Sequence, residues 1–96
     1  MSAAVLKPLV AGASQVISTA RGRYKGITVR ETAGAALTLR LWDNPSAASG
    51  SLVHVVTVPA SGSVTVHFAD LGIVFENGLY VERVAGTTYE GSVFLG

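Results

Sequence analysis

A series of short β-prone runs, each ended by a turn signal, constrains the fold more than any other feature of the sequence. Two such runs flank Pro59 and Gly62 between Ser51 and Phe68, and neither contains an acidic residue, a lysine or an arginine. No window of about 11 residues shows the sustained apolar period of an amphipathic helix. Strands separated by turns about 8–12 residues apart are typical of a sandwich or barrel. We therefore predict an all-β fold, a single antiparallel β-sandwich of about eight strands, jelly-roll-like or immunoglobulin-like.

Alternation of apolar and polar residues predicts which face of each strand is buried. In the run 24–32, Glu31 shares a face with the apolar residues. In the run 36–42, three leucines share one face, and Trp42 lies on the opposite face with Arg40. Further strands are predicted at residues 15–19, 52–58, 63–68, 73–75, 79–84 and 87–95.

A chain of 96 residues is expected to form one domain. We expect residues 1–19 to form an N-terminal arm or an edge strand, because Pro8 cannot donate a hydrogen bond to a central ladder. Residues 20–96 are expected to form the β-sandwich domain. Residues 1–18 lack the continuous apolar core of a signal peptide, and no segment approaches the length of about 20 apolar residues that a transmembrane helix needs.

The charged fraction is low for a small domain. Only 14% of the residues are Asp, Glu, Lys or Arg, against roughly 25% in ordinary soluble domains, and 49% are hydrophobic. A small domain has a high surface-to-volume ratio and should need more polar residues. An isolated monomer of this composition is expected to expose large apolar patches, which favours an oligomer or a subunit of an assembly. The alternative is a surface coated by Ser, Thr, Gly and Ala.

The net charge and the absence of cysteine exclude or disfavour several kinds of partner and site. The net charge of +1 gives no strong electrostatic reason to expect nucleic acid, a membrane surface or an acidic substrate as a partner. The chain has no cysteine, so a disulfide framework, a zinc–thiolate site and a cysteine nucleophile are excluded. A small domain without disulfides is more typical of an intracellular origin.

The two histidines do not make a convincing metal site. We predict that the strands at 52–58 and 63–68 pair as a hairpin, because only a short turn separates them. This pairing brings His54 and His67 opposite each other. A metal site needs at least one further ligand, and the sequence has no H-x-H, no H-x-x-x-H and no cysteine. Surface or interface histidines are therefore expected, and no metal ligand is assigned.

No constellation of catalytic residues is visible in the sequence. Six carboxylates can include by chance a pair at the spacing of about 5–10 Å that glycosidases use. Asp43 and Asp70, however, lie in turns, where Asp normally caps its own backbone. The sequence has no G-x-S-x-G motif, Walker loop or dinucleotide fingerprint. We therefore predict no catalytic residue, no cofactor and no small-molecule substrate, and keep a small enzyme as a third hypothesis.

Five residues are candidates for contact with a partner protein. Arg21, Arg23 and Lys25 of the run RGRYKG share one face if this segment is extended. They could meet an acidic partner surface, or they could protect a strand edge from pairing. An exposed Trp42 beside Arg40 suggests a stacking contact, and aromatic residues are enriched at protein contacts. The alternative is that Trp42 closes the end of the sandwich.

Three turn-and-strand patterns carry a resemblance to a known family. They are V-P-A-x-G-S-V-T-V at 58–66, F-x-x-G-L-Y-V at 75–81 and G-T-x-x-x-G-S-V at 86–93. With these patterns, residues 20–96 resemble the small β-sandwich virion proteins of tailed bacteriophages, which include head decoration, or cement, proteins.

The resemblance implies a non-enzymatic structural virion protein that decorates and stabilises a phage capsid by bridging neighbouring capsid subunits. It also implies a homotrimer that binds the major capsid protein on the capsid exterior and is made in the host cytoplasm. The alternative function is a carbohydrate- or receptor-binding β-sandwich module of a tail fibre or baseplate. That alternative needs an exposed aromatic platform, for which the candidates are Trp42, Tyr24, Tyr80 and Tyr89.

Overall fold

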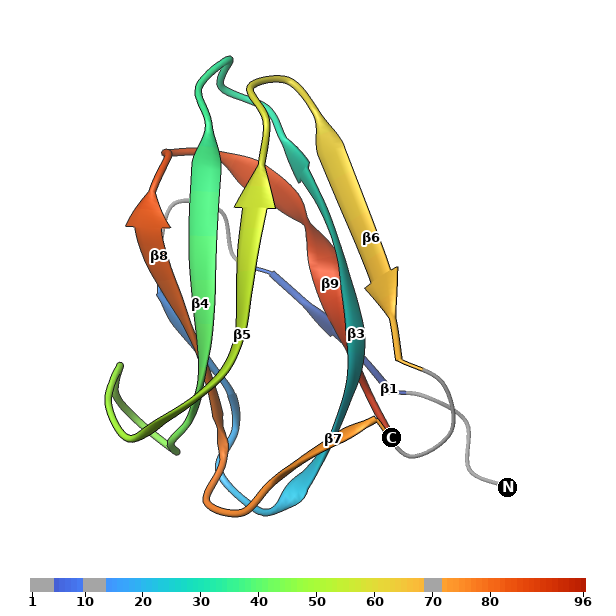
Figure 1. Ribbon diagram of the computed structural model, residues 1–96, viewed down its shortest axis with the longest axis vertical. Helices are drawn as coiled ribbons and strands as arrows, with labels where there is room; N and C mark the ends of the chain where they lie inside the picture. The colour runs from blue at the N-terminus through green and yellow to red at the C-terminus, as the bar shows by residue number, and fades with distance from the viewer. Residues whose placement is uncertain (1–4, 10–13, 69–71) are drawn as a thin grey trace.

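Two antiparallel β-sheets packed face to face make up the fold (Figure 1). The computed structural model describes residues 5–9, 14–68 and 72–96, and every regular element in these residues is a β-strand. The predicted all-β antiparallel sandwich is therefore confirmed. The strands are β1 (Val5–Pro8), β2 (Gln15–Ser18), β3 (Gly22–Glu31), β4 (Leu37–Asp43), β5 (Ser51–Val58), β6 (Ser63–His67), β7 (Ile73–Phe75), β8 (Leu79–Ala85) and β9 (Tyr89–Leu95).

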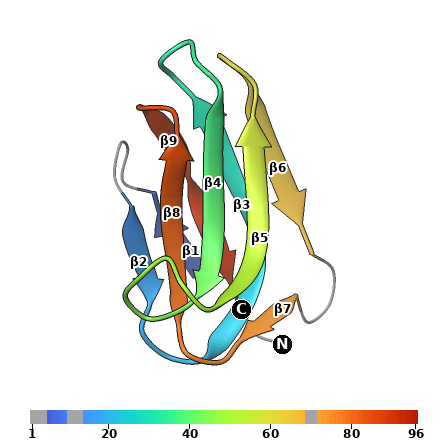
Figure 2. The same ribbon diagram turned by 60° about the vertical axis from the view of Figure 1, so that its left-hand side comes forward.

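The strand order is that of a jelly roll. Sheet A has the order β1-β9-β3-β6, with β7 also paired to β3, and sheet B has the order β2-β8-β4-β5 (Figure 2). The pairs β4–β5, β3–β6, β2–β8 and β1–β9 are nested, as in one long antiparallel hairpin. The additional pairs β3–β9 and β4–β8 show that this hairpin is rolled up on itself. Of the two predicted sandwich types, the jelly roll is therefore the one observed.

The two N-terminal strands lie at sheet edges. β1 occupies one edge of sheet A beside β9, and β2 occupies one edge of sheet B beside β8. Residues 1–4 and 10–13 of the predicted N-terminal arm lie outside the described residues. The described part of this segment thus contributes one strand to each sheet.

Alternation along the central strands builds the core. Leu37, Leu39 and Leu41 of β4 are fully buried, whereas Arg40 between them is exposed. They belong to one core cluster with Ile27 of β3, which comes from the other sheet. Burial of one such side chain contributes about 1.5–3 kcal/mol to stability. The faces predicted for these two strands are confirmed.

The prediction that β5 and β6 pair as a hairpin is wrong. β5 pairs with β4 in sheet B, and β6 pairs with β3 in sheet A. The turn between them carries the chain from one sheet to the other and is closed by a hydrogen bond of 2.9 Å from the Gly62 N–H to the Pro59 carbonyl. Two strands joined by a short turn can pair with each other or cross from one sheet to the other, and here each covers the core with its apolar face from its own sheet. His54 and His67 therefore lie on different sheets.

The Asp43 side chain binds the backbone of the turn between β7 and β8, which is distant in the sequence. Its carboxylate accepts hydrogen bonds from the backbone N–H groups of Glu76 and Asn77, at 2.9 and 2.8 Å, which are 33 and 34 residues further along the chain. Burial raises the pKa of Asp43, but these backbone hydrogen bonds outweigh burial and leave the pKa below its ordinary value. The expectation that Asp43 caps its own backbone is therefore wrong. Asp70 lies outside the described residues.

Candidate functional site

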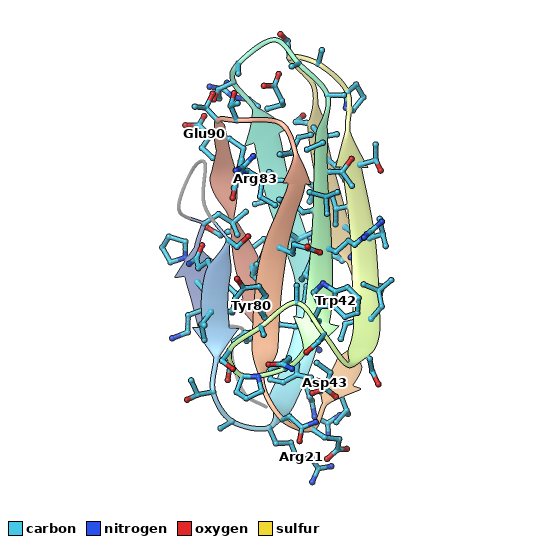
Figure 3. All side chains as sticks on the ribbon, turned by 90° about the vertical axis from the view of Figure 1, so that its left-hand side faces the viewer. Arg21, Trp42, Asp43, Tyr80, Arg83 and Glu90 are labelled. Carbon is cyan, nitrogen blue, oxygen red and sulfur yellow. The ribbon has the colours of Figure 1, made fainter. Side chains whose placement is uncertain are left out.

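An apolar row crosses the outer face of sheet B. In the strand register, Trp42 of β4 lies between Tyr80 of β8 and Leu52 of β5, and Tyr80 pairs in turn with Val16 of β2. Side chains at directly paired positions lie on the same face of a sheet. Figure 3 shows Trp42 and Tyr80 on the face that is turned toward the viewer. We refer to Val16, Tyr80, Trp42 and Leu52 as the apolar row.

The ends of the apolar row are exposed. Val16 is 42% exposed and Leu52 is 48% exposed, while Trp42 and Tyr80 are half-buried between them. Val55, which is 46% exposed, adds apolar surface on β5. Among the described residues, four of the six exposed large apolar side chains belong to strands of sheet B. Of the described residues, sheet B therefore carries most of the exposed large apolar side chains.

Polar side chains border the apolar row. Arg40 and Glu82 are register partners on the two central strands of sheet B, and the Trp42 indole N–H donates a hydrogen bond of 3.1 Å to Glu82 Oε1. This bond satisfies the polar atom of the indole and restricts its rotation. A restricted side chain loses less conformational entropy when a partner covers it. An apolar centre with a polar border is the usual composition of a protein interface.

The five predicted contact residues form two separate groups. Arg40 and Trp42 lie on the outer face of sheet B, where Trp42 is half-buried. Arg21, Arg23 and Lys25 lie at the beginning of β3 in sheet A, with Arg21 directly before the strand. A register shift around Lys25 indicates a bulge, so the three cations do not follow one regular pleat. The fold does not bring the two groups together.

Sequence reasoning identified Trp42 but missed the apolar row as a unit. Tyr80 lies between two fully buried residues of β8, so alternation alone places it on the outside. Alternation does not give the order β2-β8-β4-β5, which brings Val16, Tyr80 and Leu52 into line with Trp42. That order depends on pairing between segments that are far apart in the chain.

His54 faces inward and links the two sheets. The Tyr24 hydroxyl lies 2.8 Å from His54 Nδ1, and the Phe68 ring packs against both rings at centroid distances of 5.4 and 5.6 Å. Burial lowers the pKa of His54 and raises the pKa of Tyr24, so both groups are neutral at neutral pH. His67 instead stacks on Phe94. The described residues contain no group of three or more His, Cys, Asp or Glu side chains that could hold a metal ion.

Comparisons with known proteins identify no relative. Protein-family models, curated proteins and solved structures gave no match for this chain. In the part of the chain that the structure describes, no helix is long and apolar enough to span a membrane. The function therefore has to be inferred from the surface of the sandwich.

Proposed function

We propose that this chain is a non-enzymatic structural protein that binds other protein chains through the outer face of sheet B. The observation that carries the proposal is the apolar row, which crosses all four strands of that sheet. The resemblance to phage decoration proteins gives the proposal a specific form. In that form the chain is a homotrimeric cement protein on the exterior of a capsid, where it bridges neighbouring copies of the major capsid protein.

The size of the molecule supports this proposal. The chain exposes 4988 Å², and a standard protein interface buries about 800 Å² on each partner, which is about one sixth of that surface. Tryptophan and tyrosine, which form the centre of the apolar row, are the residues that most often dominate binding energy. Several such contacts per subunit would account for a charged fraction of only 14%.

Charged substitutions in the apolar row test this proposal. Leu52→Asp and Val16→Asp each introduce a carboxylate at an exposed position, so the fold should be retained. We expect each substitution to weaken binding to capsid shells that lack the decoration protein by about 30-fold or more, the scale of an interface hot spot. Co-sedimentation measures this binding. Ser63→Asp, which is exposed on sheet A, is the matched control and should bind like the wild type.

Two results would argue against the proposal. The first is equal capsid binding by Leu52→Asp, Val16→Asp and Ser63→Asp. The second is a wild-type protein that stays monomeric at high concentration by light scattering and binds no capsid shell. A trimer in solution that binds shells of the major capsid protein is the expected result.

A second candidate function is carbohydrate or receptor binding at the same face, favoured by the neighbouring positions of Trp42 and Tyr80. Of the four aromatic side chains considered for a platform, Tyr24 and Tyr89 are buried, which leaves this pair. A glycan array with the purified protein separates the two functions. Specific glycan binding that is lost in Trp42→Ala would favour the carbohydrate-binding module.

A further inference from the structure

A depression of about 220 Å³ at the beginning of β3 is lined by Arg21, Gly22, Arg23 and Val74. It lies on sheet A, where β3 pairs with β7 and Arg23 is the register partner of Val74. Gly22 lies between the two arginines in the sequence, and a Cβ atom added there would lie 2.8 Å from the ring of the buried Phe75, so its side-chain position faces the core. The depression is therefore distinct from the apolar row, which belongs to the other sheet.

The chemistry of the lining residues defines what the depression can bind. Arg21 and Arg23 are two residues apart on an extended segment, so their Cα atoms are about 7 Å apart. Each guanidinium presents five N–H donors in a planar fork that matches the oxygen atoms of a carboxylate or phosphate. Val74, which is 39% exposed, adds an aliphatic wall. A carboxylate on an aliphatic stem would contact both features, whereas a free phosphate would contact the guanidinium groups alone.

We propose that this depression binds an acidic side chain, glutamate or aspartate, of a partner protein. The proposal rests on the structural function proposed above, to which it adds a polar contact on sheet A. One subunit then has an apolar contact on one sheet and an acid-binding contact on the other. Contacts on opposite sheets would allow one subunit to touch two neighbours, which bridging requires.

Glu76 competes with the partner in the isolated chain. Its Oε2 lies 3.3 Å from Arg21 Nε, and both side chains are more than half exposed. Exposed ion pairs of this kind are weak, so a partner carboxylate can displace Glu76. The Glu76 backbone N–H donates a hydrogen bond to the Asp43 carboxylate, and this contact does not involve the Glu76 side chain. Removal of the Glu76 charge is therefore expected to strengthen binding, whereas removal of an arginine should weaken it.

Amide chemical shifts of the isotope-labelled protein can follow this binding. The protein is titrated with a hexaglutamate peptide and, separately, with inorganic phosphate, and the amides of Gly22 and Val74 are observed. Arg23→Ala should weaken peptide binding about tenfold or more, the scale of a charge-assisted hydrogen-bonded pair. Glu76→Gln should strengthen binding about threefold, because it removes the competing carboxylate. Val74→Thr should weaken binding of the peptide but not of phosphate.

Matched variants distinguish peptide binding at this depression from a general effect of positive charge and from a loss of folding. Arg40→Ala removes the same charge on the opposite sheet and should leave the peptide affinity unchanged. Arg23→Lys keeps the charge but loses the planar fork, so it should also bind the peptide more weakly. Leu52→Asp should bind the peptide normally, which keeps this test independent of capsid binding through the apolar row.

The proposal is overturned if the peptide does not shift the Gly22 and Val74 amides, or if Arg23→Ala and Arg40→Ala weaken its binding equally. It is also overturned if phosphate binds as tightly as the peptide and Val74→Thr changes neither affinity. That outcome would assign the depression to free anions rather than to an acidic side chain.

Discussion

Gly26 shows how one residue shapes the outer face of sheet A. It pairs with Phe94 on one side and with His67 on the other, and these two rings stack at a centroid distance of 4.9 Å. Its φ is 146°, and a Cβ atom added there would lie 2.1 Å from the Val66 carbonyl oxygen. An alanine would therefore force β3 and β6 apart.

Gly26→Ala should lower the free energy of unfolding by more than about 1 kcal/mol, because both the backbone conformation and the contact with β6 disfavour a side chain. Urea denaturation measures this change. Gly34→Ala is the control, since Gly34 also has a positive φ but a Cβ there would meet no atom within 4 Å. Its loss should be smaller, and equal losses would show that steric contact with β6 is unimportant.

Glu31 is a second residue with an effect beyond its own strand. The Ser61 N–H donates a hydrogen bond of 2.7 Å to its carboxylate, and the Gly34 N–H donates one of 2.8 Å. The Ser61 hydrogen bond is the largest influence on the pKa of Glu31. Burial opposes it, but further backbone hydrogen bonds add to it, so the pKa lies below the ordinary value of 4.5. The carboxylate thus joins the loop after β3 to the turn between β5 and β6.

The pKa of Glu31 determines the direction of a pH effect. Because its pKa is lower in the folded state, the carboxylate stabilises the fold above pH 4.5, and this contribution is lost as the pH falls through the folded-state pKa. Glu31→Gln should therefore lower the urea midpoint at neutral pH, and its difference from the wild type should shrink in acid. A difference that is the same at all pH values would contradict this account. Glu90→Gln, at an exposed position, is the control.

At the scale of elements, the sequence predicted the strands and their faces better than their partners. The pleat of a strand is a local property, so alternation was sufficient to place Glu31 inward and Trp42 outward. Strand pairing depends on packing between distant segments, which is why the β5–β6 hairpin was predicted wrongly. The role of Asp43 was missed for the same reason, because the loop it binds is formed by a different part of the chain.

The hydrogen bond between Tyr24 of β3 and His54 of β5 links the two sheets, and the titration of His54 tests this link. Burial lowers the pKa of His54 below 6.5 in the folded state, whereas the unfolded chain binds a proton at the ordinary value. Protonation therefore favours the unfolded state, and stability should fall as the pH drops through 6.5. His54→Asn should remove this part of the pH dependence in urea denaturation. An unchanged slope in the variant would show that His54 is not its source.

Loss of the Tyr24 hydroxyl tests how much the hydrogen bond to His54 stabilises the fold. Tyr24→Phe keeps the ring contacts with His54 and Phe68 and removes the hydrogen bond to His54 Nδ1. The expected cost is about 0.5–1.5 kcal/mol, the usual net contribution of one hydrogen bond. Thermal or urea unfolding measures this cost, and Tyr80→Phe on the outer face of sheet B is the matched control. Equal stability of Tyr24→Phe and the wild type would contradict a stabilising role for the hydrogen bond.

At the scale of the whole molecule, the rolled hairpin buries one face of every central strand, and among the residues that the structure describes no further layer of strands covers the other face of either sheet. Sheet A presents an arginine-lined depression on this outer surface, and sheet B presents the apolar row. A charge-poor domain with two such faces is suited to a position between other protein chains.

Hydroxyl-radical footprinting of Trp42 and Tyr80 tests this central claim most directly. Both side chains are half-buried in the isolated chain and should react with the radical there. If the outer face of sheet B is a protein contact, the oxidation of Trp42 and Tyr80 should fall several-fold in the assembled particle. The oxidation of His67, which lies on sheet A, is the control that measures labelling outside that face. Equal oxidation of Trp42 and Tyr80 in the free and the assembled protein would contradict the account.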